Sequence, residues 1–305
     1  MLLECVQSAL AQTYREIEIL VSDDSPNDET EQILEKSGAL SDGRVRYIRN
    51  PKSLGEVDNI NQLFDMARGD RVLLIHDDDW IFPNAVEDLD APWRLEEGLD
   101  VSYGLQKYAD ENGKVYDETS EMMNKGYFRS EEYFGLQKEV RFSAMMGQLP
   151  NNGTLIRTAL ARKVGNRQKG VCDYDFGLRL ALESEKWFLI DKYVSAVRAS
   201  AESGLRTKNR KIYHNPCDIT WNLVENYDLP PHLEKWRQRR LRELAMGTVA
   251  KWLYDGKRRQ AAKVIFSDKY ALFSKFSKKK LLFAALLFFP HAVQRYVIAD
   301  FMRFR

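Results

Sequence analysis

Three consecutive aspartates, Asp77, Asp78 and Asp79, follow a run of apolar residues and a single histidine. Residues 73–84 read LLIHDDDWIFPN, in which His76 directly precedes the acids. An apolar run that ends in acids is typical of a buried strand that surfaces at its C-terminal end. Adjacent carboxylates repel one another unless a positive charge lies among them. Either this loop is simply well solvated, or a cation belongs there.

Divalent cations such as Mg²⁺ and Mn²⁺ suit such a loop, because they prefer oxygen ligands and often use one or two carboxylates together with substrate phosphates. Asp77 and Asp79 are two residues apart, and we predict that they share the ion across an irregular turn. A second acidic pair, Asp23 and Asp24, ends the apolar run EIEILVSDD. That pair by itself is also ordinary turn chemistry.

Alternating helices and strands would position both acidic groups. Periodicity and cap signals predict helices over residues 2–12, 28–38, 56–69 and 83–95, and strands over 16–24, 44–50 and 70–79. Such alternation is typical of an α/β fold with a mostly parallel sheet flanked by helices. Ligands bind these sheets outside the carboxyl ends of the strands. Both acidic groups fall at such ends, so we predict that they form one site.

The pattern changes towards the C-terminus. Residues 153–165 predict a strand leading into a helix, and residues 172–185 predict an amphipathic helix with acids at its front. From residue 215 onward the sequence is helical and basic. We therefore predict an α/β domain over residues 1–205 and a helical, basic C-terminal extension over residues 206–305.

The charge distribution argues against a nucleic-acid partner. The 46 basic residues nearly balance the 45 acidic ones, which gives a net charge of +1. Acids dominate residues 23–100, whereas bases dominate beyond residue 235. A uniform nucleic-acid binder would not concentrate its acids in the half that forms the core.

The cysteines and the N-terminus indicate a cytoplasmic protein. Cys5, Cys172 and Cys217 are far apart and odd in number, which favours a reducing compartment over a disulfide framework or a zinc site. The first residues, MLLECVQSALAQTY, lack the basic and apolar regions of a signal peptide. No clean apolar run reaches the length of about 18 residues that a spanning helix needs.

Four stretches resemble, in order and spacing, the family-two glycosyltransferases with a GT-A fold. They are SALAQTYREIEILVSDDSPNDETEQIL, NPKSLGEVDNINQLFDMARGDRVLLIHDDDW, NNGTLIRTALARKVG and CDYDFGLRLAL. The resemblance covers roughly residues 3–198. It implies a Rossmann-like sheet flanked by helices and transfer of a sugar from a nucleotide-diphosphate donor, with a UDP-sugar as the commonest choice.

The resemblance also implies roles for individual acids. Asp24, with Asp23 beside it, would contact the nucleotide base, and the DxD motif would bind the metal through Asp77 and Asp79. Asp77 and Asp78 would also hold the diphosphate of the donor. Mg²⁺ or Mn²⁺ would be the metal.

Asp173 inherits the role of catalytic base, because it matches the acid of the family's ED pair. Its place at a helix N-terminus favours the charged form, which keeps it ionised and makes it a weaker base. Asp175 is the second choice for the base. Asp175, Asn152 and Gly153 are candidates for the acceptor side. A single carboxylate opposite the leaving diphosphate suits one displacement with inversion at the anomeric carbon.

The chain departs from the family pattern in four places. Relatives begin with a central strand ahead of the helix that residues 2–12 match, and this strand is missing. We expect a truncated or misassigned start, a strand supplied by another chain, or an inactive protein. Cys172 replaces the usual glutamate, Ile60 replaces a frequent arginine, and Ser200 replaces a frequent histidine.

The tail SKFSKKKLLFAALLFFPHAVQRYVIADFMRFR pairs a lysine cluster at 275–280 with an apolar run at 281–289. Pro290 interrupts that run. A basic stretch beside a short apolar helix fits a helix that lies in a membrane interface and is drawn to anionic lipid. We therefore predict peripheral membrane contact through residues 275–305. A helix packed on the protein with solvated lysines is the alternative.

The sequence thus predicts an inverting, metal-dependent glycosyltransferase acting on a glycan or lipid-linked acceptor in cell-surface polysaccharide or lipopolysaccharide synthesis. The missing strand, Ile60 and Ser200 favour an alternative, a catalytically silent nucleotide-sugar-binding or scaffold protein. A phosphatase or phosphotransferase of the haloacid-dehalogenase type shares the DxD pattern. It would need further Thr/Ser and Lys motifs that the sequence lacks.

Overall fold

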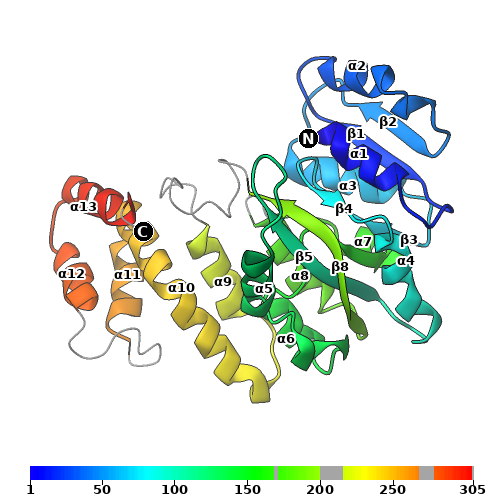
Figure 1. The fold of residues 1–305 in the computed structure, drawn as a ribbon. Helices are drawn as coiled ribbons and strands as arrows, with labels where there is room; N and C mark the ends of the chain where they lie inside the picture. The colour runs from blue at the N-terminus through cyan, green and yellow to red at the C-terminus, as the bar shows by residue number, and fades with distance from the viewer. Residues whose placement is uncertain (168–170, 200–215, 268–277, 304–305) are drawn as a thin grey trace. The chain divides into compact units, whose positions relative to one another are not determined.

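The largely apolar stretch WFLIDKYVSAVR forms the longest strand, β8, of the computed structural model. This strand pairs in parallel with one neighbour and antiparallel with two others. The sheet has the order β3–β7–β5–β8–β4, with β6 beside β8. Figure 1 shows the long strands β5 and β8 side by side. The strands of this sheet are β3 (Arg71–Leu73), β4 (Trp80–Ile81), β5 (Val101–Ala109), β6 (Gly135–Leu136), β7 (Thr154–Arg157) and β8 (Trp187–Arg198).

A second, two-stranded sheet consists of β1 (Ile19–Asp23) and β2 (Val45–Arg49), which run parallel in the register Ile19 to Val45. The pairs β1–β2 and β5–β8 are parallel, and the other four pairs are antiparallel. The predicted α/β fold with flanking helices is confirmed, although its sheet is mixed.

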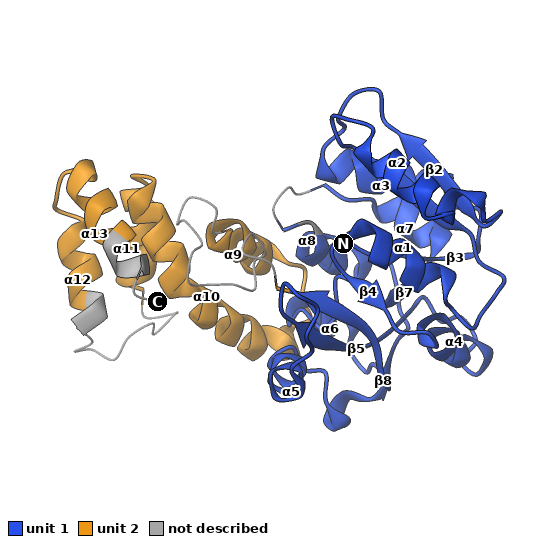
Figure 2. Cartoon of the chain, turned by 45° about the horizontal axis from the view of Figure 1, so that its top comes forward, with its two compact units in different colours: residues 1–198 blue, residues 199–305 orange. Residues whose placement is uncertain are grey.

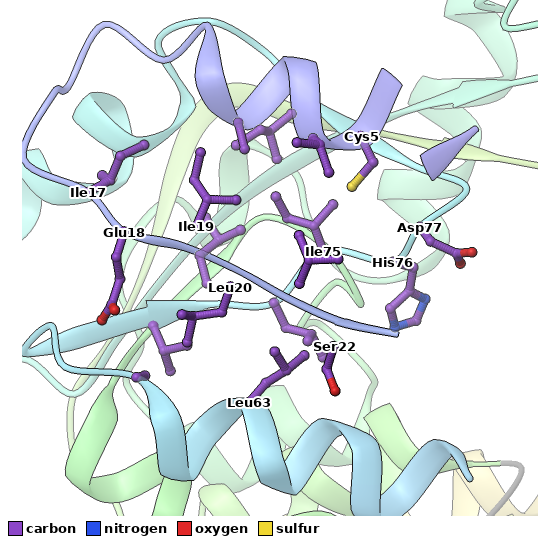
Figure 3. A pocket seen from close by; sticks show the side chains of 18 of the residues that line it. Cys5, Ile17, Glu18, Ile19, Leu20, Ser22, Leu63, Ile75, His76 and Asp77 are labelled. Atoms are coloured by element: carbon purple, nitrogen blue, oxygen red, sulfur yellow. The ribbon is translucent and has the colours of Figure 1, made fainter. Parts of the chain in front are cut away.

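A cavity of about 890 Å³ lies between β1 and β3, with the first helix on one side (Figure 3). Its lining is largely apolar and includes Leu20, Leu63 and Ile75. In the part of the chain that the structure describes, backbone hydrogen bonds join β1 only to β2 as a ladder, and β3 only to β7. No backbone ladder therefore joins the two sheets in the described residues, and the cavity lies between them.

Helices cover the sheets and bury apolar side chains against them. A fully buried cluster beneath the fourth helix includes Leu89 and Val194, and each such side chain contributes about 1.5–3 kcal/mol by leaving water. The helices of this part are α1 (Leu2–Leu10), α2 (Glu29–Lys36), α3 (Glu56–Met66), α4 (Ala85–Asp90), α5 (Asp117–Gly126), α6 (Val140–Met145), α7 (Thr158–Val164) and α8 (Cys172–Leu180).

The structure describes residues 1–167, 171–199, 216–267 and 278–303. It divides into two compact units, Met1–Arg198 and Ala199–Arg305, which Figure 2 colours separately. The predicted boundary at residues 205–206 lies outside the described residues, as does Ser200. The side chain of Cys172 is not described either.

The second unit is helical, as predicted. Its longest helix packs against its neighbours through buried residues such as Leu241 and Val249. Trp221 and Trp252 meet edge to face with ring centroids 6.0 Å apart. The helices are α9 (Cys217–Asn226), α10 (Glu234–Tyr254), α11 (Arg258–Ile265), α12 (Lys278–Leu286) and α13 (His291–Arg303). None of the helices described has both the length and the apolar character needed to cross a bilayer.

Candidate active site

The acidic turn connects β3 to β4. Its backbone closes where the Asp79 N–H donates to the His76 carbonyl at 3.2 Å. The three acids differ in exposure: Asp77 is exposed, Asp78 is half-buried, and Asp79 is only 2% exposed. The turn therefore directs one carboxylate into the protein and leaves another in solvent.

Buried Asp79 is held by two donors from distant parts of the chain. Its Oδ1 accepts the backbone N–H of Arg198 at 2.6 Å, and its Oδ2 accepts the side-chain amide of Asn152. Burial raises the pKa of Asp79 to about 6, a rise to which the neighbouring charge of Asp78 adds. The two hydrogen bonds and the charge of His76 oppose this rise without cancelling it.

Asn152 bridges both ends of the acidic turn. Besides donating to Asp79, it accepts the backbone N–H of His76 through Oδ1 at 2.7 Å. Its side chain is completely buried. The acceptor-side role that we predicted for Asn152 remains a prediction, and the structure adds the contact through which it shapes the turn.

Gly153 lets this loop approach β8 closely. Its φ is +84°, and a Cβ at this position would lie 2.6 Å from Val194 Cγ2 and 2.9 Å from Ser195 Oγ. Both the backbone conformation and the available space therefore call for glycine.

Gly153→Ala is expected to destabilise the protein by about 2–4 kcal/mol, because it adds a steric clash to an unfavourable φ. Urea unfolding measures the change. Gly126→Ala is the matched control, because a Cβ at Gly126 meets no atom within 4 Å and the position has no positive φ. Equal stability of the two variants would contradict this account of the loop.

Three side chains around the turn form a group that fits a metal ion. Within the described part of the chain, His76, Asp78 and Asp79 bring one ligand atom each to within 4.8 Å of one another. Asp77, which the sequence suggested as a ligand, is not in this group. His76, which directly precedes the acids, supplies the nitrogen of this group.

Asp173 lies next to this group. Its Oδ1 is 3.8 Å from His76 Nε2, and its side chain is 46% exposed. Partial burial in the site raises the pKa of Asp173, as does nearby Glu56, whereas His76 lowers it. The helix N-terminus was expected to favour the charged form of Asp173, whereas desolvation and the charge of Glu56 act in the opposite direction.

Asp175 has different surroundings, although it is only two residues away. It is buried, and its Oδ2 accepts hydrogen bonds from Arg179 Nε at 3.0 Å and Nη2 at 2.8 Å. Arg179 also donates to the carbonyls of Val164 and Gly165 at the end of α7. Asp175 therefore ties α8 to α7, and Asp173 is the carboxylate of this pair that faces His76.

Asp23 and Asp24 rim the carboxyl end of the cavity between β1 and β3, which His76, Asp77 and Asp78 also line (Figure 3). This placement brings the two acidic groups to one cavity. Burial disfavours ionised Asp23, but hydrogen bonds from Ser25 and Tyr47 outweigh it and lower the pKa of Asp23.

Asp24 organises the loop that leads into α3. Its carboxylate accepts the backbone N–H groups of Leu54 and Gly55 at 2.8 and 2.7 Å, and the side chains of Ser53 and Asn50. Slight burial opposes ionisation, but these four bonds lower the pKa of Asp24 to about 2. A second cavity, of about 570 Å³, lies beside Asp24 and is lined by residues 24–26 and 49–53.

The family model for glycosyl transferase family 2 matches residues 1–160, more than half of the chain. The chain belongs to this family. The two acidic groups lie within the matched residues: Asp23 ends β1, and Asp77 to Asp79 follow β3.

Two curated relatives illustrate the similarity. The chain is 23% identical over 215 residues to the uncharacterized glycosyltransferase MJ1057 of Methanocaldococcus jannaschii, covering 69% of this chain and 70% of that protein. It is 36% identical over 75 residues to UDP-Glc:alpha-D-GlcNAc-diphosphoundecaprenol beta-1,3-glucosyltransferase WfaP of Escherichia coli, covering 25% and 29%. The family-2 relatives thus include an enzyme of lipid-linked glycan synthesis.

Solved structures share the fold. TarS of S. aureus in complex with UDP-GlcNAc superposes with a TM-score of 0.62 at 17% identity, covering 99% of this chain and 86% of that one. The mannosyltransferase PcManGT of Pyrobaculum calidifontis, in complex with GDP-Man and Mn²⁺, gives 0.57 at 12% identity, covering 99% and 83%. These similarities confirm the predicted GT-A fold.

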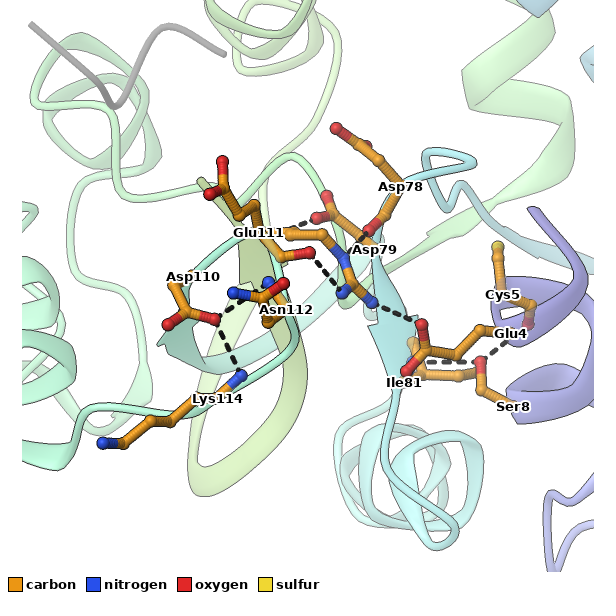
Figure 4. A network of polar contacts seen from close by, with 11 residues as sticks. Glu4, Cys5, Ser8, Asp78, Asp79, Ile81, Asp110, Glu111, Asn112 and Lys114 are labelled. Carbon is orange, nitrogen blue, oxygen red and sulfur yellow. Dashed lines mark hydrogen bonds and ion pairs between the residues drawn. The ribbon is translucent and has the colours of Figure 1, made fainter. Parts of the chain in front are cut away.

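One residue that is central to this family-2 site was not predicted from the sequence. Arg198, the last residue of β8, is 5% exposed and contacts both Asp78 and Asp79 (Figure 4). A basic residue at the end of a long apolar strand was the available signal. It could not be interpreted without knowing that β8 runs beside β4.

Proposed function

We propose that this family-2 protein is an inverting, metal-dependent glycosyltransferase that moves a hexose from a nucleotide-diphosphate sugar to a hydroxyl group. One observation carries the proposal. The carboxylate of Asp173, which no other side chain neutralises through an arginine or lysine contact among the described residues, lies 3.8 Å from His76 of the candidate metal group. A proton acceptor therefore lies beside the place where a diphosphate would be held.

The donor set suits Mg²⁺ or Mn²⁺. Two carboxylates provide hard oxygen ligands, an imidazole adds a nitrogen that Mn²⁺ accepts, and buried Asp79 carries a charge that a cation would compensate. Bound there, the ion would neutralise the charge that develops on the leaving diphosphate. Asp77 is exposed beside this group. Its predicted part in holding the metal and the diphosphate is tested by the thermal shift of an Asp77→Asn variant with UDP and Mn²⁺.

Asp173 would take the proton of the acceptor hydroxyl as that oxygen attacks the anomeric carbon. A raised pKa makes its carboxylate a stronger proton acceptor than an ordinary aspartate. Asp175 is already paired with Arg179. A single available carboxylate fits one displacement with inversion.

The nucleotide would lie towards Asp23 and Asp24. Asp24 accepts four hydrogen bonds, which matches the capacity of a carboxylate, so it shapes the cavity at residues 49–53 and would reach the base only if that loop moved. UDP is the nucleotide that we propose, supported by the UDP-sugar names of TarS and WfaP.

The acceptor that we propose is a glycan or a lipid-linked glycan of the cell surface, with Asn152 and Gly153 on the acceptor side. The name of WfaP supports this class. We further infer a cytoplasmic location. The second candidate is a silent nucleotide-sugar-binding protein, which the separation of β1 from β3 favours.

Thermal stability with Mn²⁺ and a panel of nucleoside diphosphates tests the donor site. A ligand that binds the folded state alone raises the melting temperature through mass action. We expect a metal-dependent shift with UDP. Turnover of the matching UDP-sugar, followed by proton NMR of the anomeric centre, then distinguishes inversion from retention, and binding without turnover would favour the silent candidate.

We also propose that the second unit touches a membrane surface. Large apolar side chains are exposed on and between α12 and α13, among them Leu281 (63%), Phe288 (85%) and Tyr296 (78%). Arg258 and Arg295 lie nearby, hydrogen-bonded to Phe289 and Tyr254. The lysine cluster at 275–280 falls at residues whose side chains the structure does not describe.

Phe288→Ser is expected to weaken binding to phosphatidylglycerol-containing vesicles about tenfold or more, because a buried phenylalanine contributes about 1.5–3 kcal/mol. Vesicle co-sedimentation measures the effect. Leu95→Ser is the control, since Leu95 is 81% exposed in the other unit. Unchanged binding by Phe288→Ser, or no binding by the unaltered chain, would refute membrane contact.

A further inference from the structure

Arg198 joins separate parts of the first unit around the acidic turn, and Figure 4 labels its partners Glu4, Asp78, Asp79 and Glu111. Its backbone N–H donates to Asp79 Oδ1 at 2.6 Å, and its Nε donates to the Asp78 carbonyl at 2.8 Å. Its Nη1 donates to the Glu111 carbonyl at 3.3 Å, and its Nη2 forms an ion pair with Glu4 of α1. Strand β8, the turn, α1 and the loop after β5 therefore meet at one guanidinium.

The side chain has little freedom within this arrangement. Its Cζ lies 4.8 Å from the centre of the Trp80 ring, and the whole residue is 5% exposed. Gly113 makes room on the other side, because a Cβ there would lie 3.2 Å from Arg198 Nη1. A planar guanidinium with five donors can satisfy several acceptors at fixed angles, which lysine cannot do.

The bonds from Arg198 act on the backbone of Asp78 and on one oxygen of Asp79. The Nε bond goes to the carbonyl of Asp78 and leaves its carboxylate available, and one ligand atom each of His76, Asp78 and Asp79 lies within 4.8 Å of the others. We propose that Arg198 is a positioning residue that sets the geometry of the candidate metal group, with Glu4 holding the guanidinium in place. This inference rests on the proposed function, because it concerns the same metal site.

Removal of the Arg198 guanidinium should change the affinity for Mn²⁺ in opposite directions if Arg198 positions the ligands or if it acts only through its charge, which makes the inference testable. The guanidinium is a positive charge beside a cation site, so charge repulsion alone predicts that removing it tightens metal binding. Positioning predicts the reverse, because residues that orient metal ligands typically contribute about 10–100-fold in metal affinity. The sign of the change in the affinity for Mn²⁺ therefore separates the two explanations.

In the experiment, Mn²⁺ is titrated into the full chain with saturating UDP, and electron paramagnetic resonance measures the concentration of free Mn²⁺. Arg198→Met is expected to raise the Kd for Mn²⁺ about 10–100-fold. Arg198→Lys keeps the charge but reaches fewer acceptors, so its Kd for Mn²⁺ should lie between that of the unaltered chain and that of Arg198→Met. Glu4→Gln keeps a hydrogen-bond acceptor and should raise the Kd less than Arg198→Met does.

Arg162→Met is the matched control. Arg162 also donates to several backbone carbonyls, at Phe64, Asp65 and Ala67, but it does not contact the acidic turn. It should lower the melting temperature and leave the Kd for Mn²⁺ unchanged within about twofold. A folded Arg198→Met or Arg198→Lys variant that binds Mn²⁺ as tightly as the unaltered chain, or more tightly, would overturn the inference.

A metal-free measurement separates failure of this inference from failure of the proposed function. Amide hydrogen exchange over residues 76–81 should become at least about tenfold faster in Arg198→Met, and not in Arg162→Met, because the side-chain bonds to Asp78, Glu111 and Glu4 are lost while only the backbone N–H bond to Asp79 stays. If the unaltered chain binds no Mn²⁺ while exchange responds as expected, the metal site is wrong and the positioning is right. Unchanged exchange in Arg198→Met overturns the positioning role.

Discussion

Asp173→Asn is expected to lower kcat for glycosyl transfer by about 10²–10⁴-fold, the usual contribution of a general base. Asparagine has nearly the same shape but cannot accept the acceptor's proton. Donor binding should change little, because Asp173 is not in the metal group. Steady-state rates with a UDP-sugar and the matching thermal shifts with UDP and Mn²⁺ measure the two effects separately.

Asp191→Asn is the control for Asp173→Asn, because Asp191 is an exposed carboxylate on β8. It should retain the rate of the unaltered chain. Full activity of Asp173→Asn would remove Asp173 from the reaction, and Asp175→Asn would then be examined as the second choice. A weaker thermal shift in Asp173→Asn would instead indicate that its carboxylate helps to bind the donor.

Asp79→Asn is expected to abolish the metal-dependent thermal shift with UDP, by raising the Kd for Mn²⁺ more than about 100-fold. The melting temperature without metal should change by only a few degrees. Removing a charge whose burial raises its pKa relieves strain in the folded state, whereas the new amide forfeits one of the bonds from Asn152 and Arg198. These two effects on stability have opposite signs.

Asp65→Asn serves as the reference for Asp79→Asn, since Asp65 is exposed on α3. The sequence predicted Asp77 and Asp79 as the metal ligands, whereas the structure groups His76, Asp78 and Asp79. Asp77→Asn distinguishes these two sets of ligands. Asp79→Asn with an undiminished shift would refute the metal site. Loss of the shift in Asp77→Asn would restore Asp77 as a ligand.

Much of the fold could be predicted from local patterns. Alternation of apolar runs and capped helices predicted α1 to α3, β1 and β2 within about three residues, because neighbouring positions in the sequence determine these elements. The strand predicted over residues 70–79 was too long, since β3 ends at Leu73, and the helix predicted over residues 83–95 was too long, since α4 ends at Asp90. The convergence of Asp23 and Asp24 with Asp77 and Asp78 on one cavity followed from their positions at or after strand ends. The family resemblance added the GT-A fold.

The details of the site could not be predicted, because they depend on contacts between distant residues. Asp79 accepts hydrogen bonds from Asn152, which is 73 residues away in the sequence, and from Arg198, which is 119 residues away. Nothing in the DDD triplet says which carboxylate a turn will bury. Likewise, the raised pKa of Asp173 comes from its surroundings in the assembled site, whereas the helix dipole was visible in the sequence.

The position of Arg198 at the end of β8 also bears on when the site can form during synthesis. β8 is the last strand of its unit to leave the ribosome, yet it pairs with β4, β5 and β6. A nascent chain that ends before residue 198 therefore has α1, the acidic turn and Asn152, but not the residue that joins them. During that interval the unpaired edges of β4 and β5 are open to wrong partners. Translation speed across residues 160–200 should consequently affect the yield of soluble protein more than speed across the preceding helices.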